Sequence, residues 1–214
     1  MAALKHMRAA DRGTIVQVGS ALAHRAIPLQ SAYCGAKYAL RGFTDSLRSE
    51  LEHEASPIRL SMVQLPGVNT PQFTWCRSKL PRRPEPIPPL FSPDAAAEAI
   101  LSAVHEAPRE LWVGGPSLQL ILGGAVAPGL MDRKLADQAW SGQMSDRPQD
   151  EPHPGNLFEP VPGDYAADGR YVDMARHSAT TVNPATLRTA GMAAAGTLAV
   201  GALSMLLASR RRRA

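Results

Sequence analysis

Tyr33 and Lys37 have residue types and a spacing that favour proton-transfer chemistry. They lie four positions apart in a helical pattern that runs from residue 31 to about residue 52, so both side chains project from one face, one turn apart. A free tyrosine has a pKa near 10 and is a poor proton shuttle at neutral pH. A fixed ammonium beside it favours the phenolate, lowers the pKa and makes the phenol a general acid or base for an alcohol or carbonyl oxygen.

Ser20 could complete this apparatus. It follows an apolar, β-branched run at residues 14–18, bounded by glycines, which predicts a buried strand. A hydroxyl at the carboxyl end of that strand could hold the same substrate oxygen by a hydrogen bond. The alternative is that Tyr33 and Lys37 are an ordinary solvated pair on a helix surface, because a Y-x-x-x-K pattern alone also arises by chance.

With these residues, the sequence resembles the short-chain dehydrogenase/reductase family over roughly residues 1–115. The matching features are Ser20 after the strand TIVQVG, the family's Y-x-x-x-K signature in the segment YCGAK, and a Pro-Gly segment, LPGVNT, at residues 65–70. The resemblance implies that Tyr33 is the catalytic acid/base and that Ser20 orients the substrate carbonyl. It also implies that Lys37 binds the nicotinamide ribose and depresses the pKa of Tyr33.

The same resemblance implies NAD or NADP as the cofactor and a small alcohol or ketone as the substrate. The implied cofactor-binding residues are Tyr33, Lys37, Pro66, Gly67 and Thr70, with Thr70 near the carboxamide. The implied fold is α/β, a Rossmann-like doubly wound parallel sheet. Pairing through the helices that bear the Tyr–Lys motif, and hence a homo-oligomer, is a further implication.

Dinucleotide binding needs a Gly-rich turn between a strand and a helix N-terminus, and the sequence has no such turn in a suitable place. Residues 1–10 have the pattern of the last turns of a helix without an N-cap. We therefore expect a chain truncated at its N-terminus, which lacks the cofactor-binding half. A decayed, non-catalytic product is the less favoured explanation, because a sheet without its central strands exposes apolar edges.

Three parts are expected along the chain: a partial catalytic domain at 1–140, a linker at 141–187 and an anchor at 188–214. Within the first part the patterns predict a strand at 57–65, a loop or lid at 72–90 and a helix that Ser92 caps. A short strand at 110–113 and two helical pieces broken at Pro128 follow. The linker is rich in Pro, Gly, Asp and Asn and has no periodicity, which predicts disorder.

Residues 190–209 carry no charge and are followed by four arginines. Twenty residues at 1.5 Å each span the hydrocarbon core of a membrane, so we expect a C-terminal hydrophobic helix that attaches the protein to a membrane. A helix buried in a soluble protein is the alternative. The catalytic domain is expected in the cytoplasm, where its cofactor is, and an apolar substrate is the hypothesis that the anchor suggests.

Composition excludes some other functions. The net charge of +4 equals the four terminal arginines, so the folded body has no basic excess and nucleic-acid binding is not expected. Two cysteines make no disulfide framework, and six histidines show no metal-ligand spacing. His24 could line a substrate pocket or be a plain loop histidine. The rival function is a non-catalytic, membrane-tethered scaffold or binding protein derived from such an enzyme.

Overall fold

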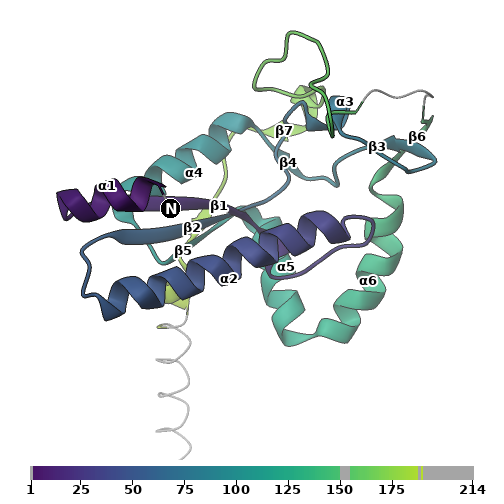
Figure 1. The fold of residues 1–214 in the computed structure, drawn as a ribbon. Helices are drawn as coiled ribbons and strands as arrows, with labels where there is room; N and C mark the ends of the chain where they lie inside the picture. Colours follow the sequence, from purple (N-terminus) through teal and green to yellow (C-terminus); the bar gives the residue numbers. More distant parts are fainter. Residues whose placement is uncertain (1, 150–154, 188, 190–214) are drawn as a thin grey trace, which may run out of the picture.

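A four-stranded sheet forms the middle of the computed structural model, which describes residues 2–149, 155–187 and 189. The strands lie in the order β1 (Thr14–Ser20), β2 (Arg59–Leu65), β5 (Glu110–Val113) and β8 (Thr181–Val182). β1, β2 and β5 run parallel, and β8 is antiparallel to β5. This confirms the predicted α/β class with a parallel sheet (Figure 1).

Helices cover both faces of the sheet because the side chains of β2 alternate between them. Leu60 belongs to a cluster with Leu4, Leu47, Leu51 and Ile58, which packs α1 (Ala2–Ala10) and α2 (Ser31–His53) on one face. Val63 points to the opposite face, where it meets Ala99 and Ala103 of α4 (Pro93–Glu106). Figure 1 shows α2 and α4 on opposite sides of the strands.

The ends of the helices follow the expected signals. The Ser92 hydroxyl accepts a hydrogen bond from the Ala95 N–H at 3.2 Å, and Pro93 occupies the first turn of α4. The two expected C-terminal pieces are α5 (Gly114–Val126) and α6 (Pro128–Ser141). Pro128 begins α6, where the N–H that a proline lacks is not needed.

The segment predicted as a disordered linker, 141–187, instead supplies strands in its described residues. β6 (Met144–Pro148) pairs with β3 (Arg82–Pro84), β7 (Ala175–Arg176) with β4 (Leu90–Phe91), and β8 with β5. Two short helical turns complete the fold: α3 (Gln72–Trp75) follows β2, and η2 (Val172–Met174) precedes β7. Strands of two residues are held by backbone hydrogen bonds and leave no periodic pattern in the sequence.

The predicted anchor, residues 190–209, lies outside the described residues and stays a prediction. Within residues 2–149 and 155–187, we find no helix with the length and apolar character that crossing a membrane requires.

Candidate active site

The carboxyl ends of β1 and β2 bring the predicted site residues to one edge of the sheet. The parallel register places Ser20 opposite Leu65, so Pro66 and Gly67 leave the sheet beside Ser20. In open α/β sheets, ligands bind at this carboxyl edge.

Ser20 is buried at the last position of β1, where it caps the short turn η1 (Ala21–Ala23). Its Oγ accepts a hydrogen bond from the Leu22 N–H at 3.2 Å. A hydroxyl that accepts one bond still has its own hydrogen to donate. The turn therefore orients Ser20 and leaves its O–H available for a substrate oxygen.

Tyr33 and Lys37 lie in the first two turns of α2, and the Lys37 Nζ is 5.6 Å from the centroid of the Tyr33 ring. Lys37 also donates a hydrogen bond to the Val18 carbonyl oxygen of β1 at 3.0 Å. The Ser20 side chain lies close enough to Tyr33 to lower the pKa of its phenol as a hydrogen-bond partner. The structure thus gathers Ser20, Tyr33 and Lys37 into one group.

The electrostatics of the group differ from the sequence-based expectation that Lys37 depresses the pKa of Tyr33. Burial raises the pKa of Tyr33 above its usual value, the Ser20 hydrogen bond lowers it, and the nearby Cys34 raises it, with a net upward direction. Burial also lowers the pKa of Lys37. The reason is that burial of the phenol is the largest effect on its pKa, while the Lys37 ammonium lies over the ring and donates to the Val18 carbonyl.

The predicted cofactor-binding loop follows β2. The carbonyl oxygen of Gly67 accepts a hydrogen bond from Phe91 N–H at 3.0 Å, which ties the loop to β4. A side chain at Gly67 would bring its Cβ within 3.1 Å of Leu90. Thr70 lies further along the loop, where its main chain packs against Gly169. Pro66 and Gly67 are therefore placed beside Ser20, whereas Thr70 is engaged by the C-terminal segment.

Asn69 has a structural role that the sequence did not predict. It is fully buried, its Nδ2 donates to the Gly169 carbonyl at 3.2 Å, and its Oδ1 accepts from the Tyr171 N–H at 3.1 Å. These bonds fasten the segment around residues 169–171 onto the loop after β2. Its partners lie about 100 positions away in the chain, so no local signal could have revealed them.

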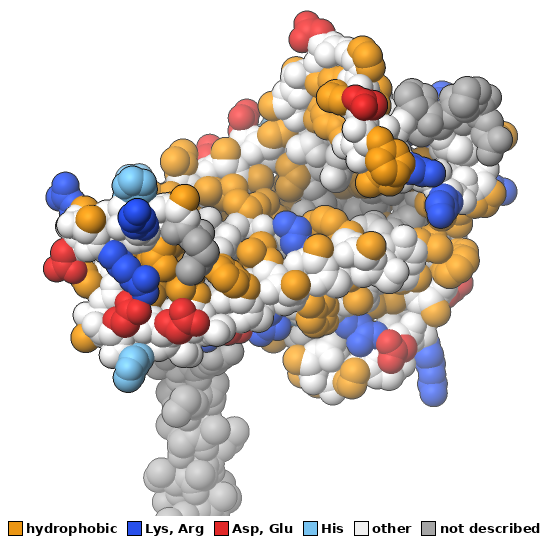
Figure 2. Space-filling model, in the orientation of Figure 1, with side chains coloured by type: hydrophobic (Ala, Val, Ile, Leu, Met, Phe, Trp, Pro, Cys, Tyr) orange, Lys and Arg blue, Asp and Glu red, His pale blue; other side chains and the backbone are white. Residues whose placement is uncertain are grey.

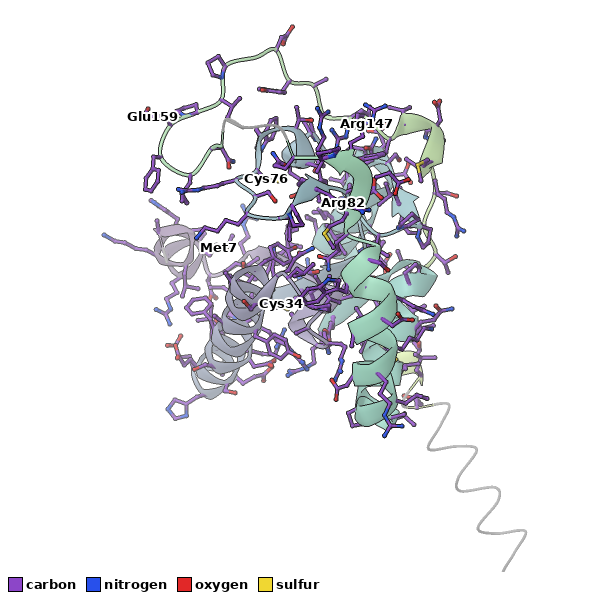
Figure 3. All side chains as sticks on the ribbon, turned by 90° about the vertical axis from the view of Figure 1, so that its right-hand side faces the viewer. Met7, Cys34, Cys76, Arg82, Arg147 and Glu159 are labelled. Carbon is purple, nitrogen blue, oxygen red and sulfur yellow. The ribbon has the colours of Figure 1, made fainter. Side chains whose placement is uncertain are left out.

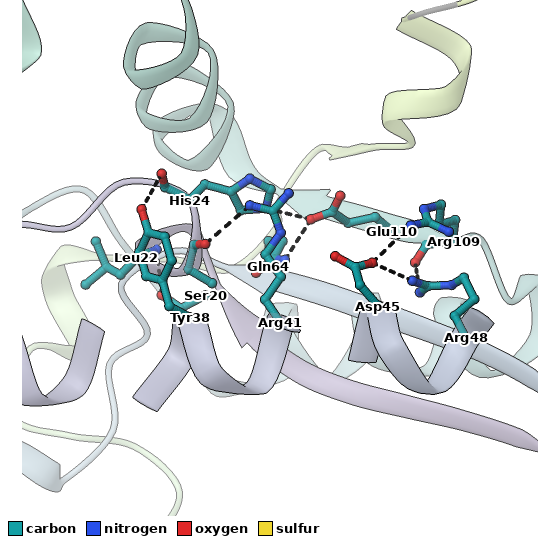
Figure 4. A network of polar contacts seen from close by, with 11 residues as sticks. Ser20, Leu22, His24, Tyr38, Arg41, Asp45, Arg48, Gln64, Arg109 and Glu110 are labelled. Atoms are coloured by element: carbon teal, nitrogen blue, oxygen red, sulfur yellow. Dashed lines mark hydrogen bonds and ion pairs between the residues drawn. The ribbon is translucent and has the colours of Figure 1, made fainter. Parts of the chain in front are cut away.

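A polar cluster lies next to Ser20 and between the sheet and α2 (Figure 4). His24 Nε2 is 2.6 Å from Glu110 Oε1, and Gln64 Nε2 donates to the same oxygen at 2.7 Å. Burial raises the pKa of Glu110, but hydrogen bonds from His24 and Gln64 and the charge of His24 outweigh it and lower the pKa to about 2. His24 is thus held in the interior by Glu110, whereas the sequence alone left open whether it lines a substrate pocket or is a plain loop histidine.

The two cysteines lie apart and are both free. Cys34 is buried on α2 and Cys76 is half-buried after α3, and Figure 3 shows them at different levels of the molecule. Cys34 enters the site only through its effect on the pKa of Tyr33.

A surface hollow of about 520 Å³ lies between α3 and the segment 156–165. Trp75 and Tyr165 meet in it edge to face, with ring centroids 4.4 Å apart, and Phe158 on its rim is 80% exposed. Figure 2 shows hydrophobic side chains gathered on this upper part of the molecule. The lining includes none of the predicted site residues, so the hollow is separate from the Ser20–Tyr33–Lys37 group.

Comparison with known protein families gives a match in the first part of the chain. Residues 1–80, which include Ser20, Tyr33, Lys37, Pro66, Gly67 and Thr70, match the family described as short chain dehydrogenase. This segment of the chain is therefore similar to the short-chain dehydrogenase/reductase family.

Among individual proteins, the chain is similar to an uncharacterized oxidoreductase, YxnA, of Bacillus subtilis, with 31% identity over 160 residues that cover 74% of this chain and 45% of the relative. It is also 48% identical over 48 residues to the human dehydrogenase/reductase SDR family member 7, covering 22% of this chain and 14% of that protein. The chain spans less than half the length of these curated relatives.

A short chain dehydrogenase from Burkholderia cenocepacia, solved in complex with NADP, covers 62% of this chain and 54% of its own at 24% identity, with a TM-score of 0.46.

The family match corrects the expectation that the N-terminal cofactor-binding part is missing. The matched region begins at residue 1 and continues to residue 80, and the similarity to YxnA covers 74% of the chain. The first residues also belong to the folded body, because Leu4 of α1 is buried against Leu47 and Leu51 of α2. The family match therefore contradicts the prediction that the family's N-terminal cofactor-binding part is missing.

Proposed function

We propose that the protein is an oxidoreductase that transfers a hydride between NAD or NADP and an alcohol or ketone, with Tyr33 as the general acid or base. The observation that carries this proposal is the convergence of Ser20 and Lys37 on Tyr33 at the carboxyl edge of the sheet. The family match of residues 1–80 supports it.

The residues present fit the nicotinamide–ribose part of such a cofactor. A lysine ammonium has three donors, and the Val18 carbonyl takes one donor of Lys37, which leaves two for ribose hydroxyls. Gly67, at the end of the neighbouring strand, has no side chain that could obstruct a ring lying over the loop. We propose that Lys37, with Pro66 and Gly67, holds this part of the cofactor and that Thr70 lies further along the same path.

When bound, the nicotinamide supplies or accepts the hydride, and the residues of this chain manage the proton. In the reducing direction, the Tyr33 phenol donates its proton to the carbonyl oxygen as negative charge develops there. Ser20 donates a hydrogen bond to the same oxygen and stabilises that charge. In the oxidising direction, Tyr33 takes the proton from the alcohol, which requires the phenolate, and Ser20 favours this form because it lowers the pKa of Tyr33.

Turnover with matched tyrosine variants tests the proposal. NAD(P)H oxidation is measured with a panel of apolar ketones, and the reverse reaction with the corresponding alcohols. Tyr33→Phe removes the phenolic proton and is expected to lower the rate by about 10²- to 10⁴-fold. Tyr165→Phe, which removes a hydroxyl that binds the Pro162 carbonyl, should keep the wild-type rate. Equal rates in the two variants, or no turnover of any substrate by the wild-type chain, would exclude the proposed role.

A further inference from the structure

The proposed chemistry does not use the buried pair of His24 and Glu110, so the presence of two ionisable groups in the interior needs another explanation. The side chains are 9% and 15% exposed, and Gln64, which donates to the same carboxylate oxygen, is fully buried. Buried ionisable groups are costly unless they are well paired, and apolar residues could often replace such a pair without loss of stability. A role beyond stability is therefore worth testing.

The pair fixes the turn η1 to the sheet, and α2 fixes the same turn from the other side. The His24 ring is bound to Glu110 of β5 and stands edge-on to Trp112 of the same strand, with centroids 6.0 Å apart at 77°. The His24 carbonyl accepts the Tyr38 hydroxyl at 2.6 Å, and the Ala23 carbonyl accepts Arg41 Nη1 at 3.4 Å. Figure 4 shows the bonds of His24 to Tyr38 and Glu110 at this end of the turn.

The other end of the turn holds Ser20. The His24 N–H closes the turn by donating to the Ala21 carbonyl at 3.0 Å, and the Leu22 N–H within it orients the Ser20 hydroxyl. A displacement of His24 therefore moves the donor that sets the direction of Ser20. Displacements of about 1 Å are enough to cost a site on the order of 10² in rate.

We infer that His24 and Glu110, backed by Gln64, are positioning residues: they clamp η1 so that the Ser20 hydroxyl stays beside Tyr33. The inference rests on the proposed function, in which Ser20 and Tyr33 act on one substrate oxygen. None of the three clamp residues touches the substrate in this account; they act through the turn.

The test combines kinetics with a spectroscopic measurement on Tyr33. Glu110→Ala breaks the clamp, and Glu110→Gln keeps a hydrogen-bonding group in its place. Glu110→Ala is expected to lower kcat about 10- to 100-fold with little change in NAD(P)H affinity, and Glu110→Gln to recover much of the loss. The pKa of Tyr33, obtained from tyrosinate absorbance as the difference between each variant and its Tyr33→Phe derivative, should rise in Glu110→Ala, because the Ser20 hydrogen bond that lowers it is weakened.

The control is Leu47→Ala, which disturbs the apolar cluster between α1 and α2 without contacting the turn. It should lower the melting temperature and leave both kcat and the pKa of Tyr33 unchanged. If Glu110→Ala does not fold, Tyr38→Phe, which removes only the bond to the His24 carbonyl, should give the same changes at smaller size.

The inference is overturned if Glu110→Ala lowers stability as Leu47→Ala does, but keeps the wild-type kcat and the wild-type pKa of Tyr33. If the wild-type chain shows no turnover, the proposed function fails, yet the absorbance measurement still decides the inference. A raised pKa in Glu110→Ala supports the clamp, and an unchanged pKa refutes it.

Discussion

At the scale of single residues, the spacing of Tyr33 and Lys37 predicts where they lie but not how the pKa of Tyr33 shifts. The four-residue interval correctly predicted that Lys37 lies beside Tyr33, at 5.6 Å from its ring. It did not predict the direction of the pKa shift, because burial and the partners of each group are properties of the folded chain. Since Tyr33 is 43% exposed, a bound cofactor that covers it would change this balance further.

Glu110 gives a pH-dependent prediction at the same scale. Its folded pKa of about 2 lies below the ordinary value of 4.5. A lowered carboxylate pKa stabilises the fold above the unfolded value, and the contribution disappears as the pH falls through the folded value. The shift corresponds to about 3 kcal/mol.

The measurement is urea unfolding of the wild type and Glu110→Gln between about pH 7 and about pH 2. The wild type should be more stable than Glu110→Gln at neutral pH, and this difference should shrink below about pH 4.5 and largely vanish near the lower limit. A difference that stays constant over the whole range would show that the charge of Glu110 contributes nothing to stability.

At the scale of elements, local signals predicted most boundaries. The β-branched run gave β1, the Ser-Pro-Asp start gave α4, and Pro128 separated α5 from α6. The short strands β3, β4, β6, β7 and β8 were missed, since they have two to five residues and are defined by pairing with distant partners. The polar clusters around Asn69 and Glu110 were missed for the same reason.

The N-cap of α4 is a direct test at this scale. Ser92→Ala removes the bond from the Ala95 N–H and should lower the free energy of unfolding by about 1 kcal/mol. Ser102→Ala, on the same helix but with an exposed hydroxyl that binds Glu106, should change it by much less. Equal effects of the two substitutions in urea unfolding would contradict the assigned cap.

At the scale of the whole molecule, the segment at residues 155–187 packs on the folded body, which differs from the linker that the sequence suggested. A composition rich in Pro and Gly predicted a linker, yet β7 and β8 return to the body, and Asn69 binds the segment over the loop after β2. The sequence correctly predicted the α/β class and the parallel sheet. It could not predict closure of the chain on itself, which depends on contacts over about 100 residues.

Asn69→Ala should release this return segment. The substitution leaves the Tyr171 N–H without its acceptor and the buried Gly169 carbonyl without the Asn69 donor, and an unpaired buried polar group costs about 1–3 kcal/mol. Hydrogen exchange at the amide of Tyr171 should become faster, while exchange at Val63 in the central strand stays slow. If Tyr171 remains as protected as in the wild type, Asn69 does not hold the segment.

The central claim is that Ser20, Tyr33 and Lys37 form the site of a nicotinamide-dependent oxidoreductase, and cofactor binding tests it most directly. NAD(P)H is titrated by fluorescence into the 214-residue chain, with Lys37→Met as the variant and Lys79→Met as the control outside the site. The account predicts saturable binding that Lys37→Met weakens at least tenfold, or about 1.4 kcal/mol, and that Lys79→Met leaves unchanged. The absence of saturable binding, or binding that is equal in all three chains, would contradict the account.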